Sequence, residues 1–205
     1  MSVTNGYATL TEVKSALRLT DTVDDAALEV SIEAASRMLE GHCGRRFYAD
    51  TTTSARTYVA SNPYHITVDD FLTVTGLVVK TDTALDASWA TTITAANVQS
   101  EPLNALRDGV AWAYTALSIV GSSASYFPCV SRQALVQVTA KWGWPAVPHE
   151  IRQACIIQTA ALMKAVDAPL GIAGFGDMGG MRLRQSLHPS AAALAAPFRV
   201  AVAVA

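Results

Sequence analysis

Apolar residues in the first forty positions recur at helical spacing. Four of them lie three or four positions apart: Leu28, Ile32, Ala35 and Leu39. This spacing places them on one face of a helix, which we expect over about residues 22–40, with Gly41 and Gly44 available to stop it. A shorter helix is expected before it, from the Thr9-Leu-Thr-Glu12 run, which has the spacing of a capping box, to about Leu19.

The next part of the chain, from about Arg56 to Gly143, is rich in Thr and Val and broken by turn residues. Short runs of this kind predict strands joined by turns. The expected strands are residues 56–60, 65–68, 72–74, 77–81, 91–94 and 135–142. We expect a loop or helical turn over residues 102–108, and the apolar run 110–120 fits either a strand or a helix.

Helical spacing returns after Pro148, which suits the first helical position. One stripe contains Ile151, Cys155, Gln158, Leu162 and Val166, and predicts a helix to about Asp167. The chain then changes again. Five glycines between Gly171 and Gly180 predict a hinge, residues 189–196 predict a short Ala/Leu helix, and the chain ends in VAVAVA.

The order of these elements predicts an α+β fold, mainly a small α-helical bundle core with a long β-rich insertion and an extended C-terminal tail. Residues 1–48 would form the N-terminal helices of the bundle and residues 49–145 the insertion. Residues 146–168 would form the third core helix, and residues 169–205 the hinged tail.

Composition adds that this chain carries little charge. Of its 205 residues, 51% are hydrophobic and 16% charged, against about a quarter charged in a typical globular domain. Such a chain is not disordered throughout, and its apolar excess indicates surfaces buried against neighbours. The three cysteines include no CxxC pair, so a disulfide framework is not expected. No apolar stretch reaches the roughly 20 residues of a membrane span, and the N-terminus does not resemble a signal peptide.

The motifs of known chemistry are weak or missing. Residues 174–179 match GxGxxG, but a dinucleotide site needs a preceding strand and an acid about twenty residues later; here a helix precedes and Arg199 stands at that distance. His42, His65, His149 and His188 lack metal-ligand spacing. No P-loop or GxSxG elbow is present. We therefore predict no catalytic residue, no cofactor, no metal and no enzymatic activity, although a zinc site assembled from distant positions stays open.

Charge is distributed unevenly along the chain. The formal net charge is −2, but the first 40 residues contain seven acids and three bases, whereas the tail has three arginines against one aspartate. Four of the acids form a stripe on the second helix: Asp25, Glu29, Glu33 and Glu40. Such a stripe is usually a solvated face; the alternative is a face turned toward passing DNA, which it would not bind.

Three segments, taken in order, resemble the tailed-bacteriophage head–tail connector (adaptor) family. The first is YATLTEVKSALRL (residues 7–19) with DDAAL (24–28) and GHCGRRF (41–47). The second is VQVTAKWG (136–143) with VPHEIRQA (147–154), and the third is HPSAAALAAPFR (188–199). Compact members have a shorter segment between the second and third helices, and the terminal VAVAVA extends beyond the pattern of the family.

The resemblance implies a virion structural protein. It would be a head-to-tail adaptor, a homo-oligomeric ring commonly of twelve copies, located in the virion neck and in the host cytoplasm during assembly. The ring would lie between the portal protein and a stopper or other tail-side neck protein, without enzymatic activity. DNA would pass through it without sequence-specific binding, and no membrane is involved.

These expectations assign roles to particular residues. We predict that the tail docks on the portal through Arg182, Leu183, Arg184, Leu187, Leu194, Phe198, Arg199, Val200, Val202 and Val204. We predict that the ring lumen is lined by Asp25, Glu29, Glu33 and Glu40. The alternatives are a stopper or tail-completion protein of the same neck and, from another class, a small α+β ligand-binding domain or enzyme.

Overall fold

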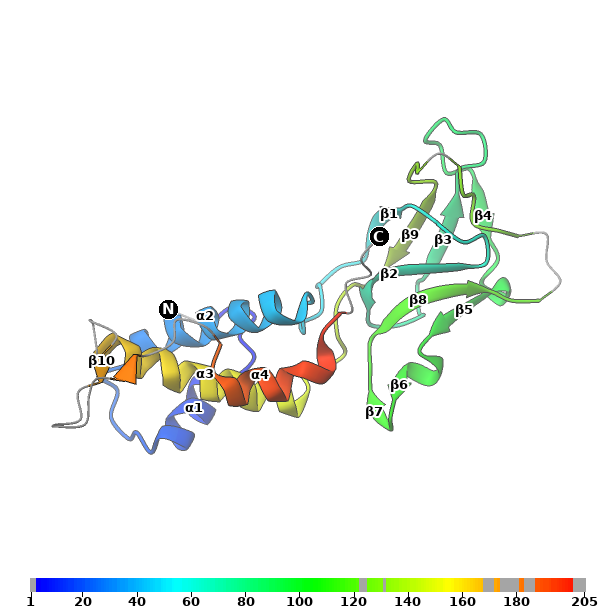
Figure 1. Ribbon diagram of the computed structural model, residues 1–205. Coiled ribbons are helices and arrows are strands. Elements are labelled where there is room, and N and C mark those ends of the chain that lie inside the picture. The colour runs from blue at the N-terminus through cyan, green and yellow to red at the C-terminus, as the bar shows by residue number, and fades with distance from the viewer. Residues whose placement is uncertain are drawn as a thin grey trace. The chain divides into compact units, whose positions relative to one another are not determined.

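The computed structural model describes residues 3–121, 125–130, 132–167, 172–173, 181–182 and 187–200. The chain divides into two compact units. The helical unit comprises Met1–Phe47 and Val147–Ala205, and the β unit comprises Tyr48–Ala146. Helices packed together in one unit and small antiparallel sheets in the other confirm the α+β fold (Figure 1).

The helical unit contains the helices that the apolar spacing predicts. They are α1 (Leu10–Leu17), α2 (Asp25–Cys43), α3 (His149–Asp167) and α4 (Pro189–Ala195), the last continued by the 3-10 turn η4 (Ala196–Phe198). Helices α2, α3 and α4 lie alongside one another (Figure 1). Helix α2 continues through Gly41 and ends at Gly44, which has a left-handed φ of 68°, so the expected end at residue 40 is three residues short. A two-residue pairing joins β10 (Ile172–Ala173) to β11 (Met181–Arg182).

The core of the helical unit follows the predicted stripes. The four α2 residues Leu28, Ile32, Ala35 and Leu39 are all at most 1% exposed. They are joined by Ile151, Ala154 and Cys155 of α3 and by Ala191 and Ala195 of α4, all fully buried. Pro148 lies one residue before α3, where its carbonyl accepts the Arg152 amide at 3.0 Å. Burial of one continuous apolar stripe per helix is what holds this bundle together.

The capping box at α1 is present as predicted. The Glu12 amide donates to Thr9 Oγ1 at 3.2 Å, and the Thr9 amide donates to Glu12 Oε2 at 2.8 Å. The Thr9 amide, with Arg152 nearby at 3.3 Å, holds the pKa of the Glu12 carboxyl below its usual value. The capping box therefore stabilises the fold when the Glu12 carboxyl is ionised.

This cap predicts a pH-dependent effect. Thr9→Ala should lower the free energy of unfolding by about 1 kcal/mol at neutral pH. A carboxyl with a lowered folded pKa stabilises above its unfolded pKa, and that stability is lost as pH falls through the folded value. Glu12→Gln should therefore be less stable than wild type at neutral pH and approach it as Glu12 is protonated. Urea unfolding followed by circular dichroism across pH 3–7 tests this; a difference that does not shrink in acid would contradict it.

The β unit is built from two antiparallel sheets and a hairpin. The first sheet has the order β1 (Ser54–Tyr58), β9 (Val136–Ala140), β3 (Val78–Thr81) and β4 (Thr91–Ile93). The second has the order β2 (His65–Phe71), β8 (Tyr114–Ile119) and β5 (Val98–Glu101). A separate hairpin pairs β6 (Leu106–Arg107) with β7 (Val110–Ala111). One apolar cluster takes residues from both sheets, including Phe71, Leu117, Val138 and Trp142.

The structure confirms five of the six expected strands and corrects the sixth. Residues 72–74 form no strand, because after the Leu72 amide donates to Lys141 O the chain turns, and Val74 O accepts the Leu77 amide within that turn. The ambiguous run 110–120 forms strands, β7 and β8. The expected turn in residues 102–108 is the 3-10 turn η2 (Leu103–Ala105), but β6 follows it at once. Strand β5 and the 3-10 turn η1 (Ala95–Asn97) had not been predicted.

Candidate functional site

The acidic stripe of α2 lies against the N-terminal segment, defined here as residues 3–9, and against α1. The Thr4 amide donates to Glu33 Oε1 at 2.7 Å, and Lys14 Nζ lies 2.6 Å from Asp25 Oδ1. The Tyr7 hydroxyl donates to Glu40. All four acids of the stripe are half-buried. Within the subunit, Glu33 and Glu40 hold the N-terminal segment on α2 and Asp25 holds α1, contacts that the sequence pattern alone did not reveal.

Arg37 of α2 also contacts the N-terminal segment. Its Nη2 donates to Asn5 O at 2.8 Å and lies 3.0 Å from Glu40 Oε1, and its guanidinium lies 5.9 Å from the centre of the Tyr7 ring. Exposed ion pairs contribute little, but here the arginine also bonds backbone and covers an aromatic ring. The N-terminal segment is thus fixed by several independent contacts.

The C-terminal segment, defined as residues 187–200, packs on its own subunit. Ala191 and Ala195 are fully buried, and Phe198 is 4% exposed with its ring edge-on to Phe47 at 5.8 Å. The Val200 amide donates to Cys43 O at 2.8 Å, at the end of α2.

The predicted portal-docking residues are therefore in different situations. Leu187 and Leu194 are half-buried, Phe198 is buried, and Arg199 and Val200 are exposed. Arg182 lies in β11. Leu183, Arg184, Val202 and Val204 lie outside the described residues.

A polar cluster that sequence reasoning missed lies on the second sheet of the β unit. Ser118 Oγ of β8 donates to Glu101 Oε1 of β5 at 2.6 Å, and His65 Nδ1 of β2 lies 3.0 Å from the same hydroxyl. In a hydrolytic triad the histidine lies between serine and carboxylate and takes the serine proton. Here the serine lies in the middle and its hydroxyl donates its hydrogen bond to Glu101 rather than to the histidine, so the arrangement is not that of a triad. Only the strand register brings these residues together, and no spacing in the sequence indicates it.

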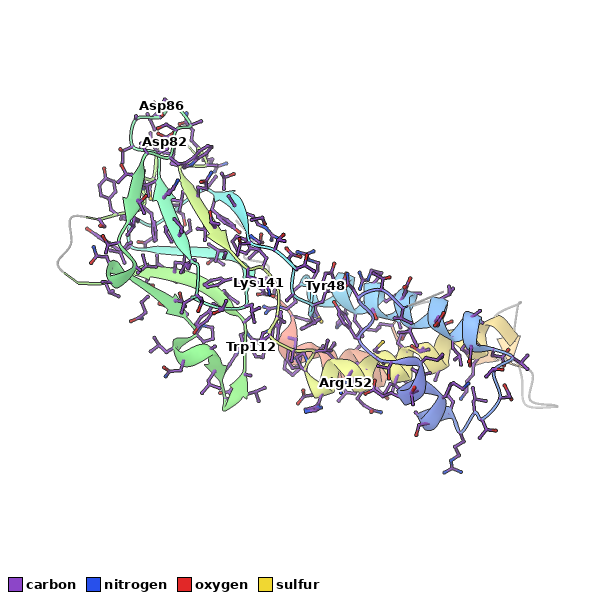
Figure 2. All side chains as sticks on the ribbon, turned by 180° about the vertical axis from the view of Figure 1, so that it is seen from behind. Tyr48, Asp82, Asp86, Trp112, Lys141 and Arg152 are labelled. Carbon is purple, nitrogen blue, oxygen red and sulfur yellow. The ribbon has the colours of Figure 1, made fainter. Side chains whose placement is uncertain are left out.

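Other polar residues serve the fold. The buried Asp82 accepts the Ala87 amide at 2.6 Å, so its carboxylate fixes the loop that carries Asp86, with which it lies at one end of the β unit (Figure 2). In the part of the chain that the structure describes, no three His, Cys, Asp or Glu side chains are grouped to hold a metal ion. No described helix is long and apolar enough to cross a membrane.

Comparison with known proteins decides the family. The model of the phage gp6-like head-tail connector proteins matches residues 7–143, well over half of the chain. The chain belongs to the phage gp6-like head–tail connector family. The resemblance inferred from the three sequence segments is thereby confirmed, and this connector is a structural component of the virion head–tail interface, in a family that is generally non-enzymatic.

Solved structures share the connector's fold. It is similar to a chain in the neck of an empty gene transfer agent particle computed with C6 symmetry, with a TM-score of 0.54, 18% identity, and coverage of 98% of this chain and 93% of the other. It is also similar to a chain in the virion of the native gene transfer agent particle, with a TM-score of 0.51, 17% identity and the same coverage. No curated protein sequence matches the connector.

The family match also bears on the long insertion of this connector. The matched range begins before α1 and runs through nearly all of the β unit, so the insertion lies within the matched part of the chain. The matched range ends before α3. The family match therefore does not extend to the C-terminal segment, which is covered by the fold similarity to the solved structures.

Proposed function

We propose that this connector is a head-to-tail adaptor that forms a homo-oligomeric ring between the portal and the tail-side neck proteins. The observation that carries the proposal is the match of residues 7–143 to the connector family. The similarity of nearly the whole chain to a protein in a C6-symmetric neck supports an oligomer. A ring of twelve copies, suggested by family analogy, is compatible with that symmetry.

The charge of the chain supports passage of DNA without gripping it. With a net charge of −2, the chain as a whole does not attract the phosphates of DNA. In this proposal Asp25, Glu29, Glu33 and Glu40 line the lumen, although three of them also hold the N-terminal segment or α1. A cryo-EM structure of the assembled neck tests the assignment. We expect these side chains on the inner wall; their location on the outer wall or between subunits would contradict it.

The C-terminal part of the chain is the proposed portal-docking element. Arg199 and Val200 are accessible as the subunit stands, and the Val-Ala alternation continues after them. An extended apolar strand of this kind can add to a partner sheet, and the arginines can pair with acids beside it. Phe198 becomes available only if the C-terminal segment leaves its own subunit, whereas half-buried Leu194 is already partly accessible.

Truncation tests this docking. A chain ending at Leu170 should lose portal binding in a pull-down, because it lacks every proposed contact. A second variant ending at Val200 keeps α4 and removes only the last five residues, and should bind measurably less. Circular dichroism must show both variants folded. Undiminished portal binding by the folded Val200 variant and the Leu170 variant alike would rule out docking through the tail.

The same pull-down, together with native mass spectrometry, separates the adaptor from the alternative functions. A stopper or tail-completion protein would retain tail-side neck proteins and not the portal. A ligand-binding domain or enzyme would remain a monomer by native mass spectrometry and bind a metabolite. A monomer that binds no metabolite is compatible with an adaptor before assembly.

A further inference from the structure

Three aromatic rings connect the two ends of the chain inside the helical unit. The Tyr7 ring lies edge-on to Phe47 at 5.6 Å and 84°, and Phe47 lies edge-on to Phe198 at 5.8 Å and 82°. All three are at most 4% exposed. Edge-to-face pairs at this spacing are favourable beyond the area they bury. The stack therefore joins the N-terminal segment, the residue that ends the first part of the unit, and the C-terminal segment.

Tyr7 also determines the backbone position of the middle ring. Its hydroxyl accepts the Phe47 amide at 2.9 Å and donates to the Glu40 carboxylate, while its own amide donates to Ser36 Oγ at 3.0 Å. Burial and the hydrogen bond to Glu40 raise the pKa of Tyr7, so the hydroxyl keeps its proton. Loss of this hydroxyl would remove a hydrogen bond from the Phe47 amide in a buried place, which is costly.

Phe198 is the last buried residue before the chain becomes exposed at Arg199. The C-terminal segment begins where the His188 amide donates to Gln158 Oε1 at 2.7 Å, and it ends where the Val200 amide donates to Cys43 O. Between these points α4 has only seven residues, too few for a stable isolated helix. The segment keeps its shape through its docking contacts, and Phe198 is the largest of them.

We propose that Tyr7, Phe47 and Phe198 form a latch that holds the C-terminal segment on its own subunit and opens when the N-terminal segment loosens. The closed latch buries Phe198, a residue that the proposed function assigns to portal docking. The role of the released Phe198 in portal docking rests on the proposed function, whereas the latch itself does not. The contact is thus autoinhibitory: the free subunit hides a portal-binding residue until the start of the chain is displaced.

Cys43 is a built-in reporter of the latch. It is 1% exposed and its Sγ lies 3.7 Å from Ala195 O, beneath the C-terminal segment. Burial raises the pKa of its thiol to about 11, so the docked protein should alkylate slowly there. Cys129 is exposed and is replaced by serine to remove the fast background. Labelling of the isolated full chain with iodoacetamide, quantified by mass spectrometry at the Cys43 peptide, then measures how often the segment lifts.

Tyr7→Phe should speed Cys43 labelling about tenfold, the factor expected when a buried amide loses its hydrogen bond. Phe198→Ala should speed it at least as much, which establishes what Cys43 reports. Lys14→Met is the matched control, since it removes the ion pair between α1 and Asp25 of α2, outside the N-terminal segment and without touching a ring, and should change the rate less than twofold. If Tyr7→Phe does not fold, Phe47→Leu serves instead, because it removes both ring contacts and keeps the bulk.

Two results would overturn the latch. One is a Cys43 labelling rate equal to that of wild type in the folded Tyr7→Phe or Phe198→Ala protein. The other is equal acceleration by Lys14→Met, which would indicate general loosening of the helical unit. Because no portal is present in the assay, a failure of portal docking in the pull-down would leave the latch standing, and a failure here would leave the proposed function standing.

Discussion

Replacing Gly143 with alanine is expected to lower the free energy of unfolding by about 3–5 kcal/mol, the combined cost of overpacking and backbone strain. A Cβ at this position would lie 2.0 Å from Tyr48 O and 2.7 Å from Ala49 Cα, and the residue has a φ of 106°. Both obstacles are backbone atoms, so no side-chain rotation relieves the clash. The chain cannot move away easily either, because the Gly143 amide donates to Asp70 O at 2.7 Å.

Gly109 provides the matched control in the same unit. It has a φ of 79° and nothing within 4 Å of an added Cβ, so Gly109→Ala carries the left-handed strain without the clash, about 1–2 kcal/mol. Urea unfolding followed by far-UV circular dichroism compares the two. A Gly143→Ala protein as stable as Gly109→Ala would show that the close approach of residues 48 and 143 is not required.

The helices could be predicted because their signal is local. A period of 3.6 in apolar residues is set by the helix itself, and every residue of the 28–39 stripe is buried. Thr/Val runs likewise predicted most strands. The order of the strands was beyond prediction, since Ser54 pairs with Ala140 across more than eighty residues and no local pattern encodes that contact. The strand predicted over residues 72–74 was wrong, because this apolar, β-favouring run forms a turn.

For the functional surfaces too, the local pattern was predictable and the long-range contacts were not. The sequence correctly placed four acids on one side of α2, but that side is covered by Thr4, Tyr7 and Lys14. It indicated that the apolar C-terminal segment needs a partner, but the partner in this subunit is Phe47, about 150 positions away. The spacing of residues in a sequence indicates which of them share a helix face, and the fold shows which residues pack against that face.

Replacement of Trp142 by alanine is the second change with a large expected effect, about 3–5 kcal/mol. The side chain is fully buried in the apolar cluster that both sheets share, and its ring lies 6.3 Å from Phe71. Its Nε1 donates to Ser54 O at 2.9 Å, and Arg56 lies over its ring at 4.4 Å. Alanine would therefore leave a large cavity, lose the indole hydrogen bond to Ser54 O, and remove the surface on which Arg56 lies.

Two variants make this test specific. Trp142→Phe keeps an aromatic ring and loses the indole hydrogen bond, so its stability should lie between those of wild type and Trp142→Ala. Trp89→Ala removes the same side chain from a half-buried position in the same unit and should cost less than half as much. Urea unfolding by circular dichroism ranks the three proteins. If Trp89→Ala proved the more destabilising, the cluster around Trp142 would not be the core of the β unit, because burial of the larger apolar area should dominate the loss.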